Sequence, residues 1–164
     1  YDFAPESEAY LKMAECQTKL GKNDDALASY EYLIKIDKSS LSLFTEPLRI
    51  ATEELGDLDR ALTLAQESTS YFPQEAQSHT YLASIYLKRG ELEKADSTIE
   101  TAFDIDPNLA EAHFTAGQIR LAQKNNEGAK WEFKKAYELS KPGDELSVEA
   151  AQEYNALILT GQAP

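Results

Sequence analysis

Few side chains in this sequence have the types and spacing that catalysis or metal binding requires. Cys16 is the only cysteine, so neither an intrachain disulfide nor a cysteine-based zinc site can form. No histidine lies at a catalytic spacing from it, and a buried, inert thiol is expected. His79 and His113 could share a metal ion only with a third ligand, and only Glu111 lies near them in sequence. We therefore expect both histidines to be packed structurally, with one ring nitrogen hydrogen-bonded.

Paired carboxylates and known motifs give no stronger sign of catalysis. Asp24 and Asp25 are adjacent, so on a helix their side chains would point about 100° apart and could not share a proton. They are better placed to interact with the positive N-terminus of a helix. The sequence contains no glycine-rich phosphate loop, nucleophile elbow or zinc-binding histidine motif. It therefore predicts a protein that is not an enzyme and has no catalytic residues, cofactor or metal.

Composition narrows the class of protein further. The 164 residues carry 16 basic and 29 acidic side chains, and a formal net charge of -13 argues against nucleic acid or an anionic membrane as the main partner. Apolar residues make up 42% and charged residues 27%, which is typical of a folded domain. No apolar run approaches the roughly 18 to 20 residues that span a bilayer, so no direct membrane insertion is expected. The localisation is open, because cytoplasmic and periplasmic proteins both fit these values.

An internal repeat sets the architecture. Spacings of 35, 34 and 34 residues separate four alanines in matching contexts, which are Ala26, Ala61, Ala95 and Ala129. Upstream of them a glycine suited to a helix C-terminus recurs, replaced by lysine in the fourth copy: Gly21, Gly56, Gly90 and Lys124. Apolar positions on both sides follow helical spacing, and Pro73 and Pro107 stand where a second helix must stop. Each copy is therefore predicted to be a hairpin of two antiparallel helices.

These residues resemble the tetratricopeptide repeat (TPR) family, whose pattern has about 34 residues per hairpin. The resemblance implies an all-α, right-handed superhelical solenoid of four antiparallel helix hairpins and a C-terminal capping helix. The repeats would cover residues 7–40, 42–75, 76–109 and 110–143, and the capping helix residues 144–160, in a single domain of residues 1–164. The opening YDFAP looks like the tail of a preceding copy, so we expect a fragment of a longer chain.

The second copy departs most from the family pattern. Arg49 stands where a small residue belongs, and Pro47 lies inside the first helix, where it removes a backbone donor. That helix is therefore predicted either to start at a Thr45 cap or to kink at the proline. The extra residue in the first spacing is assigned to the same irregularity.

The resemblance also implies a concave inner face, lined in the family by positions 2, 5, 9 and 12 of each first helix. Six of the twenty residues there are Glu and none is Lys or Arg, whereas composition alone would give about three or four acids and about two bases. A solvated acidic face is the simpler interpretation. On the functional interpretation, apolar side chains hold a partner while glutamates select its Lys or Arg. The predicted partner-binding groove consists of Leu11, Glu15, Glu46, Ile50, Glu53, Thr80, Ser84, Leu87, Glu111, Phe114, Gln118 and Leu121.

Two other modes of binding depend on single positions. Family members that bind the acidic tails of Hsp70 or Hsp90 use Lys and Asn at two clamp positions where this chain has Leu11 and Glu15, so no such carboxylate clamp is expected. Trp131 replaces the small residues of the other copies, and it could be a convex contact for a partner. The simpler interpretation is that its indole folds over the stem of Lys134 or Lys135.

The sequence thus predicts a non-catalytic protein-interaction scaffold that binds a basic and partly apolar peptide or helix in its groove. Two alternatives stay open. One is a self-assembly scaffold that forms homo-oligomers, which a concentration-dependent mass would reveal. The other is a regulatory or targeting segment of a larger enzyme, because fold alone does not imply function.

Overall fold

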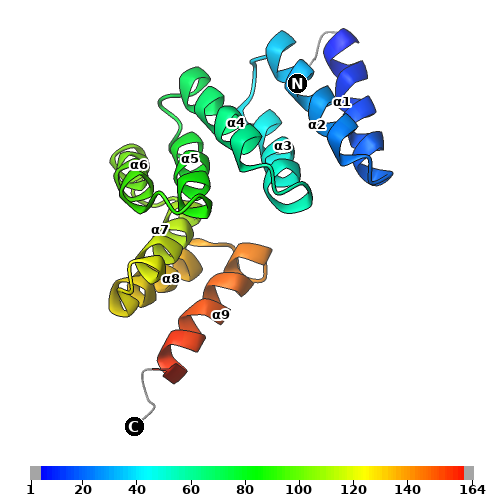
Figure 1. Cartoon of the computed structure of the whole chain (residues 1–164). Coiled ribbons are helices and arrows are strands. Elements are labelled where there is room, and N and C mark those ends of the chain that lie inside the picture. Colours follow the sequence, from blue (N-terminus) through cyan, green and yellow to red (C-terminus); the bar gives the residue numbers. More distant parts are fainter. Residues whose placement is uncertain (1–4, 161–164) are drawn as a thin grey trace. The chain divides into compact units, whose positions relative to one another are not determined.

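The computed structural model describes residues 5–160, and these residues form helices joined by turns (Figure 1). The chain divides into two compact units, with the division between Phe72 and Pro73, where the sequence had suggested one continuous domain. The segment YDFAP, assigned to a preceding copy, lies outside the described residues except for Pro5, which opens the first helix. The expectation of an all-α fold is confirmed for residues 5–160.

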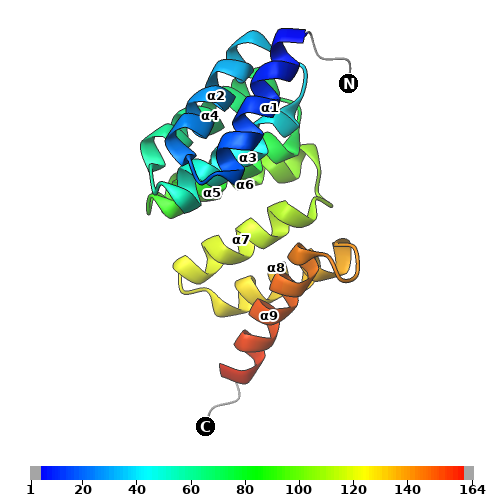
Figure 2. The same ribbon diagram turned by 90° about the vertical axis from the view of Figure 1, so that its right-hand side faces the viewer.

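The first unit contains the first two copies. Its elements are α1 (Pro5–Lys19), α2 (Asn23–Ile36), a 3-10 turn η1 (Leu41–Phe44), α3 (Thr45–Arg49), a π-helical segment η2 (Ile50–Glu54) and α4 (Leu58–Tyr71). α1 packs antiparallel on α2, which also contacts η1, α3 and η2 (Figure 2). Arg60 of α4 binds the Glu31 carboxylate of α2 through Nε and Nη2, both at 3.0 Å. This bidentate ion pair ties the second hairpin to the first.

The second unit contains the remaining two hairpins and the last helix. Its elements are α5 (Ala76–Lys88), α6 (Leu92–Ile105), α7 (Ala110–Ala122), α8 (Asn126–Leu139) and α9 (Glu145–Thr160). α5 pairs with α6 and α7 with α8, while α7 also contacts α5 and α6, and α9 packs on α8. Glu149, Gln152 and Glu153 of α9 are exposed, so this helix has the polar outer face that is typical of a capping helix.

The four turns inside the hairpins share one backbone conformation. The second residue after the first helix has a positive φ, which is 69° at Gly21, 66° at Gly56, 75° at Gly90 and 61° at Lys124. Such a left-handed residue lets the next N–H bond back to the helix, as the Glu91 N–H does to the Tyr86 carbonyl at 2.9 Å. Lys124 therefore adopts the left-handed conformation that glycine adopts in the other three copies.

The repeated alanines lie where the two helices of each hairpin cross closely. Tyr30, Ile99 and Phe133 stand one turn beyond three of these alanines and are buried beside them. In the fourth hairpin, a Cβ added to Gly117 would stand 2.7 Å from the Phe133 ring, so the ring needs glycine opposite it. The exposed fraction is 0% for each of the four repeated alanines, Ala26, Ala61, Ala95 and Ala129.

The first helix of the second copy is built from three kinds of helical turn. Ser40 caps η1 through its side chain, and α3 then begins at Thr45. The start agrees with the first predicted alternative, but Phe44 and not Thr45 stands at the N-cap of α3. Pro47 thus lies in the first turn of α3, where a missing N–H leaves no helical bond unmade. Beyond α3 the helix widens, and the Leu55 N–H donates to the Ile50 carbonyl at 3.0 Å.

This π-helical turn accommodates the extra residue of the second copy. The closing bond runs from Glu91 back to Tyr86 in the third hairpin, but from Asp57 back to Ala51, one residue further, in the second. The glycine-to-alanine spacing is the same in both, so the insertion lies before Gly56. The prediction that the extra residue belongs to this irregular helix is confirmed.

Because the insertion lies inside the helix, the residues before it are shifted by one place from the register assumed in the sequence analysis. Ile50 aligns with Ile85 and Ile119, and the exposed fractions of the three side chains are 0%, 2% and 0%. The prediction that Ile50 lines a binding groove is therefore wrong. Arg49 takes the groove position instead, so the inner face of the second copy does carry a base.

Both histidines have structural partners, as expected. His79 Nε2 lies 3.0 Å from the Pro73 carbonyl oxygen, and His113 Nε2 lies 3.0 Å from that of Pro107. His113 Nδ1 also lies 2.7 Å from Oε2 of the buried Glu132. A carbonyl oxygen only accepts, so Nε2 of His113 carries a proton, and a second proton lies between Nδ1 and the carboxylate.

Cys16 differs from expectation, because its thiol on α1 is exposed and not buried. Ile119, at the corresponding position of α7, has 0% of its surface exposed. The physical reason is that α6 packs on α7, whereas no helix of the described residues precedes α1 and covers this side of it.

Replacing Lys124 by glycine is expected to stabilise the protein. A left-handed conformation costs about 1 kcal/mol for a residue with a Cβ, and Lys124→Gly removes that cost. The free energy of unfolding in urea should rise by about 1 kcal/mol. The matched control is Gly90→Lys, whose Cβ meets nothing within 4 Å, so its loss of stability comes from the backbone alone. A loss of stability in Lys124→Gly would contradict this account.

Removing His113 is expected to destabilise the second unit strongly. The side chains of His113 and Glu132 are only 8% and 11% exposed, so His113→Ala leaves a buried carboxylate without its partner. Breaking such a pair costs about 3 kcal/mol, whereas His79→Ala removes one hydrogen bond to a carbonyl and should cost about 1 kcal/mol. Equal losses for the two variants in urea unfolding would argue against the pair as a stabilising contact.

Candidate partner-binding surfaces

A cleft in the first unit lies between α1 and the start of the second copy. An adjoining hollow of about 530 Å³ shares Glu15, Tyr30 and Glu46 with it and adds Thr18 and Lys19. Leu11, Glu15 and Glu46, which were predicted to line a groove, are thus brought together here. The cleft itself holds about 320 Å³ and is lined by Leu11, Glu15, Tyr30, Ser40, Ser42, Leu43 and Glu46.

Helical spacing explains which side chains line the cleft. Leu11, Glu15 and Thr18 follow one another at spacings of four and three residues along α1, so they share one face. Tyr30 of α2 forms the floor and is 4% exposed. Burial raises the pKa of Tyr30, the Glu46 carboxylate raises it further, and a hydrogen bond with Thr18 acts in the opposite direction. The floor of the cleft is therefore a neutral phenol.

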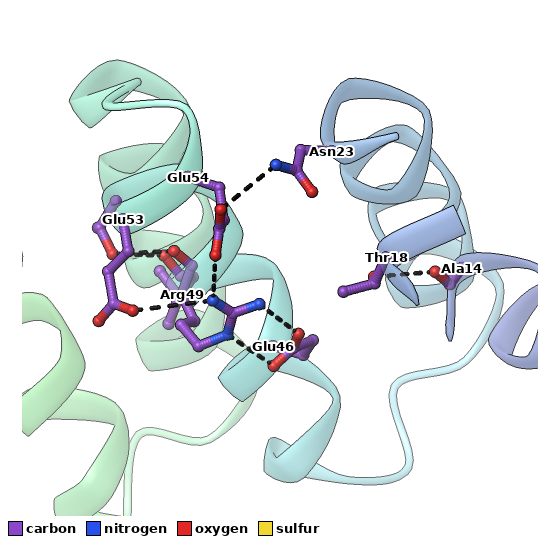
Figure 3. Close-up of polar contacts among 9 residues, drawn as sticks. Ala14, Thr18, Asn23, Glu46, Arg49, Glu53 and Glu54 are labelled. Atoms are coloured by element: carbon purple, nitrogen blue, oxygen red, sulfur yellow. Dashed lines mark hydrogen bonds and ion pairs between the residues drawn. The ribbon is translucent and has the colours of Figure 1, made fainter. Parts of the chain in front are cut away.

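Arg49 dominates the electrostatics beside the cleft (Figure 3). Its guanidinium binds both carboxylate oxygens of Glu46, through Nε at 3.1 Å and Nη2 at 2.8 Å. Nη1 donates to Glu54 at 2.7 Å and lies 3.8 Å from Glu53. Asn23 of α2 donates to the other oxygen of Glu54 at 3.4 Å, which links the network to the first hairpin. Hydrogen bonds to Glu46 and then Glu54 raise the pKa of Arg49, so it stays charged.

This network changes the role expected of two glutamates. Glu46 and Glu53 were predicted to select a partner's Lys or Arg, but Arg49 already binds the first and lies close to the second. A signal for this was present in the sequence, because Arg49 follows Glu46 by three residues and precedes Glu53 by four. It was missed because the positions of this helix were numbered back from Gly56 without an inserted residue, which assigned Arg49 to a small-residue position.

Glu15 is the cleft carboxylate that has no such partner. Within residues 5–160 its carboxylate forms no hydrogen bond or ion pair, and Lys12 on the same helix is bound to Glu8. Lys19, which lines the adjoining hollow, is exposed. Acids outnumber bases around the cleft, with Glu15, Glu46, Glu53 and Glu54 against Arg49 and Lys19.

Two predicted groove residues of the second unit, Thr80 and Glu111, differ in their exposure. Thr80 is 3% exposed and its hydroxyl donates to the Ala76 carbonyl at 3.0 Å, so the prediction that it contacts a partner is wrong. Glu111 lines a hollow of about 360 Å³ with Asp106 and Lys141, near the turns that flank the fourth hairpin. Thr80 is therefore not available to a partner lying along α5 and α7, whereas Glu111 is exposed on the same face of α7 as Phe114.

The remaining predicted groove residues of the second unit lie on two helices in contact, α5 and α7. The Phe114 ring lies edge-on to the buried Phe133 ring at 5.5 Å, which fixes its orientation. Leu87 packs against the core of the unit and is half-buried. The part of this surface left to solvent is partly apolar, and it comprises Ser84, Leu87, Phe114, Gln118 and Leu121.

Trp131 packs beside His113, whose ring is hydrogen-bonded to Glu132 in the fourth hairpin. Its ring stands edge-on to His113 at 5.8 Å, and the Lys135 ammonium lies 5.9 Å from its centroid. The side chain nevertheless keeps 54% of its surface exposed. The contact with Lys135 agrees with the simpler of the two interpretations, and the exposed remainder of the indole leaves room for a convex contact.

Metal and membrane binding find no support in the described structure. Within residues 5–160, no three His, Cys, Asp or Glu side chains gather in a group that could hold a metal ion. None of the helices found there combines the length and apolar character that a bilayer crossing needs.

Two models of a known repeat family match parts of the chain. Models of the tetratricopeptide repeat match residues 8–40 and residues 54–113. No curated protein sequence matches the chain significantly.

Solved structures that resemble this chain are also repeat proteins. A thermophilic TPR protein from Thermus thermophilus has a TM-score of 0.74 and 20% identity over 95% of this chain and 83% of that one. MamA from Desulfovibrio magneticus has a TM-score of 0.65 and 17% identity over 98% and 99%. The first TPR of Spaghetti, bound to an HSP90 peptide, has a TM-score of 0.63 and 20% identity over 77% and 99%. At these identities the likeness shows the fold alone, an all-α helical-repeat solenoid. The repeat models together match more than half of the chain, and they show that it belongs to the tetratricopeptide repeat family.

Proposed function

We propose that the protein is a non-catalytic scaffold that binds a peptide or helix of a partner protein, with the cleft of the first unit as its main recognition surface. The family's fold supports a role in protein–protein interaction. The observation that carries the finer proposal is the Glu15 carboxylate, which stands without an ion-pair partner beside Leu11 in the cleft.

The cleft has the chemistry to receive a lysine or arginine side chain. Leu11 and Leu43 offer an apolar wall for the aliphatic stem, and Glu15 offers a charge for the cationic head. Tyr30 at the floor adds a hydroxyl group for hydrogen bonding. Complementary charge of this kind gives specificity and faster association more than it gives raw affinity. The partner is therefore expected to present a basic residue flanked by apolar ones.

Arg49 tunes this site by holding Glu46 in place. Without Arg49, the carboxylates beside the cleft would repel one another and attract strongly basic segments without discrimination. With Glu46 and Glu54 neutralised, Glu15 is left as the charge that selects the partner. The proposed ligand is thus a single basic residue in an apolar context, and not a polybasic tract.

The α5 and α7 surface of the second unit is proposed as a separate apolar contact. Leu87, Phe114 and Leu121 are half-buried side chains that keep part of their surface exposed, with Gln118 as a polar neighbour. Apolar anchors with a polar rim are typical of interaction surfaces.

An acidic tail is a poor candidate for the cleft. Spaghetti was solved with the HSP90 peptide SRMEEVD, which contains two glutamates and ends in aspartate. In this chain the cleft places Glu15 and Glu46 where such a peptide would bring further carboxylates. The carboxylates of the peptide and those of the cleft carry like charges and would repel one another, so no carboxylate clamp is proposed.

Charge reversal at Glu15 is expected to weaken recognition of basic peptides. The probe is an array of heptapeptides with Lys, Ser or Glu at the centre of a leucine-rich background. The parent should retain the Lys set, with weaker binding at high salt, and Glu15→Lys should weaken it about tenfold, equivalent to about 1.4 kcal/mol. Glu149→Lys on the exposed face of α9 is the matched control and should bind as the parent does. Equal binding by parent and Glu15→Lys would overturn the proposal.

Replacement of Arg49 is expected to strengthen binding of the same Lys-centred peptides. Arg49→Gln frees the Glu46 and Glu54 carboxylates, so affinity should rise about threefold and become more sensitive to salt. The control is Arg120→Gln, which breaks a comparable pair with Asp96, 2.6 Å long, in the second unit. If Arg49→Gln bound more weakly than Arg120→Gln, Arg49 would be a contact residue and not a neutralising one.

A further inference from the structure

The phenol hydroxyl of Tyr30, at the floor of the cleft, has a fixed direction for its proton. Thr18 Oγ1 donates its only proton to the Ala14 carbonyl oxygen at 2.9 Å (Figure 3). Thr18 and Tyr30 are also hydrogen-bonded to each other. Because the Thr18 proton is already used, Tyr30 is the donor in that second bond. The Tyr30 oxygen therefore turns lone pairs, and no proton, toward the cleft.

The charge state of Tyr30 agrees with this direction of donation. Burial and then the Glu46 carboxylate raise the pKa of Tyr30, so its oxygen keeps the proton that it donates to Thr18. The hydrogen bond with Thr18 lowers the pKa of Tyr30, because Thr18 could turn its own proton toward an ionised oxygen. While the phenol is neutral, the Thr18 proton stays on the Ala14 carbonyl, and Tyr30 offers the cleft only an acceptor.

The carboxylates that line the cleft beside Tyr30 also accept hydrogen bonds. Glu15 forms no hydrogen bond or ion pair within residues 5–160, so its carboxylate is open to a ligand. Glu46 is already bound by Arg49 through both of its oxygens. The open acceptors, Glu15 and Tyr30, thus belong to two different helices, α1 and α2.

This arrangement suits a lysine ammonium better than an arginine guanidinium. An ammonium carries three N–H donors on a rotatable head, so it can bond to acceptors on separate helices. A guanidinium is a planar fork that matches both oxygens of one carboxylate, which is the role that Arg49 fills at Glu46. A lysine side chain can also lose its donors by trimethylation while it keeps its charge and its aliphatic stem.

We propose that Tyr30 is a specificity-determining residue that recognises the N–H donors of an unmodified lysine in the partner protein, so that trimethylation of this lysine weakens binding. The inference rests on the proposed function of the cleft, and it adds the identity of the partner's basic residue and its regulation. Attraction to Glu15 alone would accept any cation, trimethylated or not, because it depends on charge. The Tyr30 oxygen adds the requirement for a donor.

The test uses leucine-rich heptapeptides with lysine, trimethyl-lysine or arginine at the centre, and their affinities are measured by isothermal titration calorimetry. The parent should bind the lysine peptide about tenfold more tightly than the trimethyl-lysine peptide, because hydrogen bonds from a charged donor are lost. Tyr30→Phe should weaken binding of the lysine peptide about fivefold and leave the affinity for the trimethyl-lysine peptide unchanged. Steric exclusion of the methyl groups would give the reverse, a gain for the trimethyl-lysine peptide and no loss for the lysine peptide.

Thr18→Val is a second variant, which keeps the whole Tyr30 side chain. It removes the acceptor of the phenol proton, which is then free to compete with the ligand for Glu15, so affinity for the lysine peptide should fall about threefold. Thr52→Val is the matched control and should bind as the parent does, because Thr52 Oγ1 also donates to a carbonyl four residues earlier, that of Leu48, at 2.9 Å. If circular dichroism shows that Tyr30→Phe is unfolded, Thr18→Val decides the test.

The outcomes separate this inference from the proposed function. Equal binding of the lysine and trimethyl-lysine peptides, with both weakened by Glu15→Lys, would overturn the inference and leave the cleft as a site for a basic residue. Equal losses for both peptides in Tyr30→Phe would show that Tyr30 has only a structural role, and they would overturn it too. Tighter binding of the arginine peptide than of the lysine peptide would overturn lysine as the occupant. Binding of the lysine peptide that Glu15→Lys does not weaken would overturn both the inference and the proposed function.

Discussion

Close crossing of two helices at a residue without a large side chain is the constraint on which this structure depends. The repeated alanines allow the approach, and Gly117 shows its limit, because a Cβ there would stand 2.7 Å from the Phe133 ring. The left-handed residue at each turn brings the second helix back over the first, even where it is Lys124. The register that these crossings impose determines which side chains of each hairpin face its partner helix.

The second copy shows how that register creates the site. One residue is inserted in the first helix, and a π-helical turn absorbs it without disturbing the crossing at Ala61. The turn moves Ile50 into the core and brings Arg49 to the surface beside Glu46. A single insertion therefore sets the charge balance of the cleft and leaves Glu15 as its unpaired carboxylate. The inserted residue, a local irregularity of the backbone, thereby determines which kind of partner side chain the cleft can bind.

Much of the fold could be predicted from the sequence, because spacing alone reports helical periodicity and close contacts. The hairpins, the buried alanines, the start of α3 at Thr45 and the helical origin of the extra residue all follow from it. The site was harder, because the position of an insertion inside a helix changes which side chains face outward and leaves no local signal of its own. The burial of Thr80 and the exposure of Cys16 depend on which helices cover a face, and spacing along one helix does not report this.

The central claim is that the cleft beside Glu15 receives a partner's basic residue. It is tested most directly by an NMR titration of leucine methyl groups with a lysine-centred, leucine-rich heptapeptide. We expect the methyl signals of Leu11 and Leu43 to shift with a common binding curve, while those of Leu139 and Leu159, which are 39% and 71% exposed, stay unchanged. Shifts confined to Leu139 and Leu159 would show non-specific apolar contact, and unshifted signals of Leu11 and Leu43 would contradict the account.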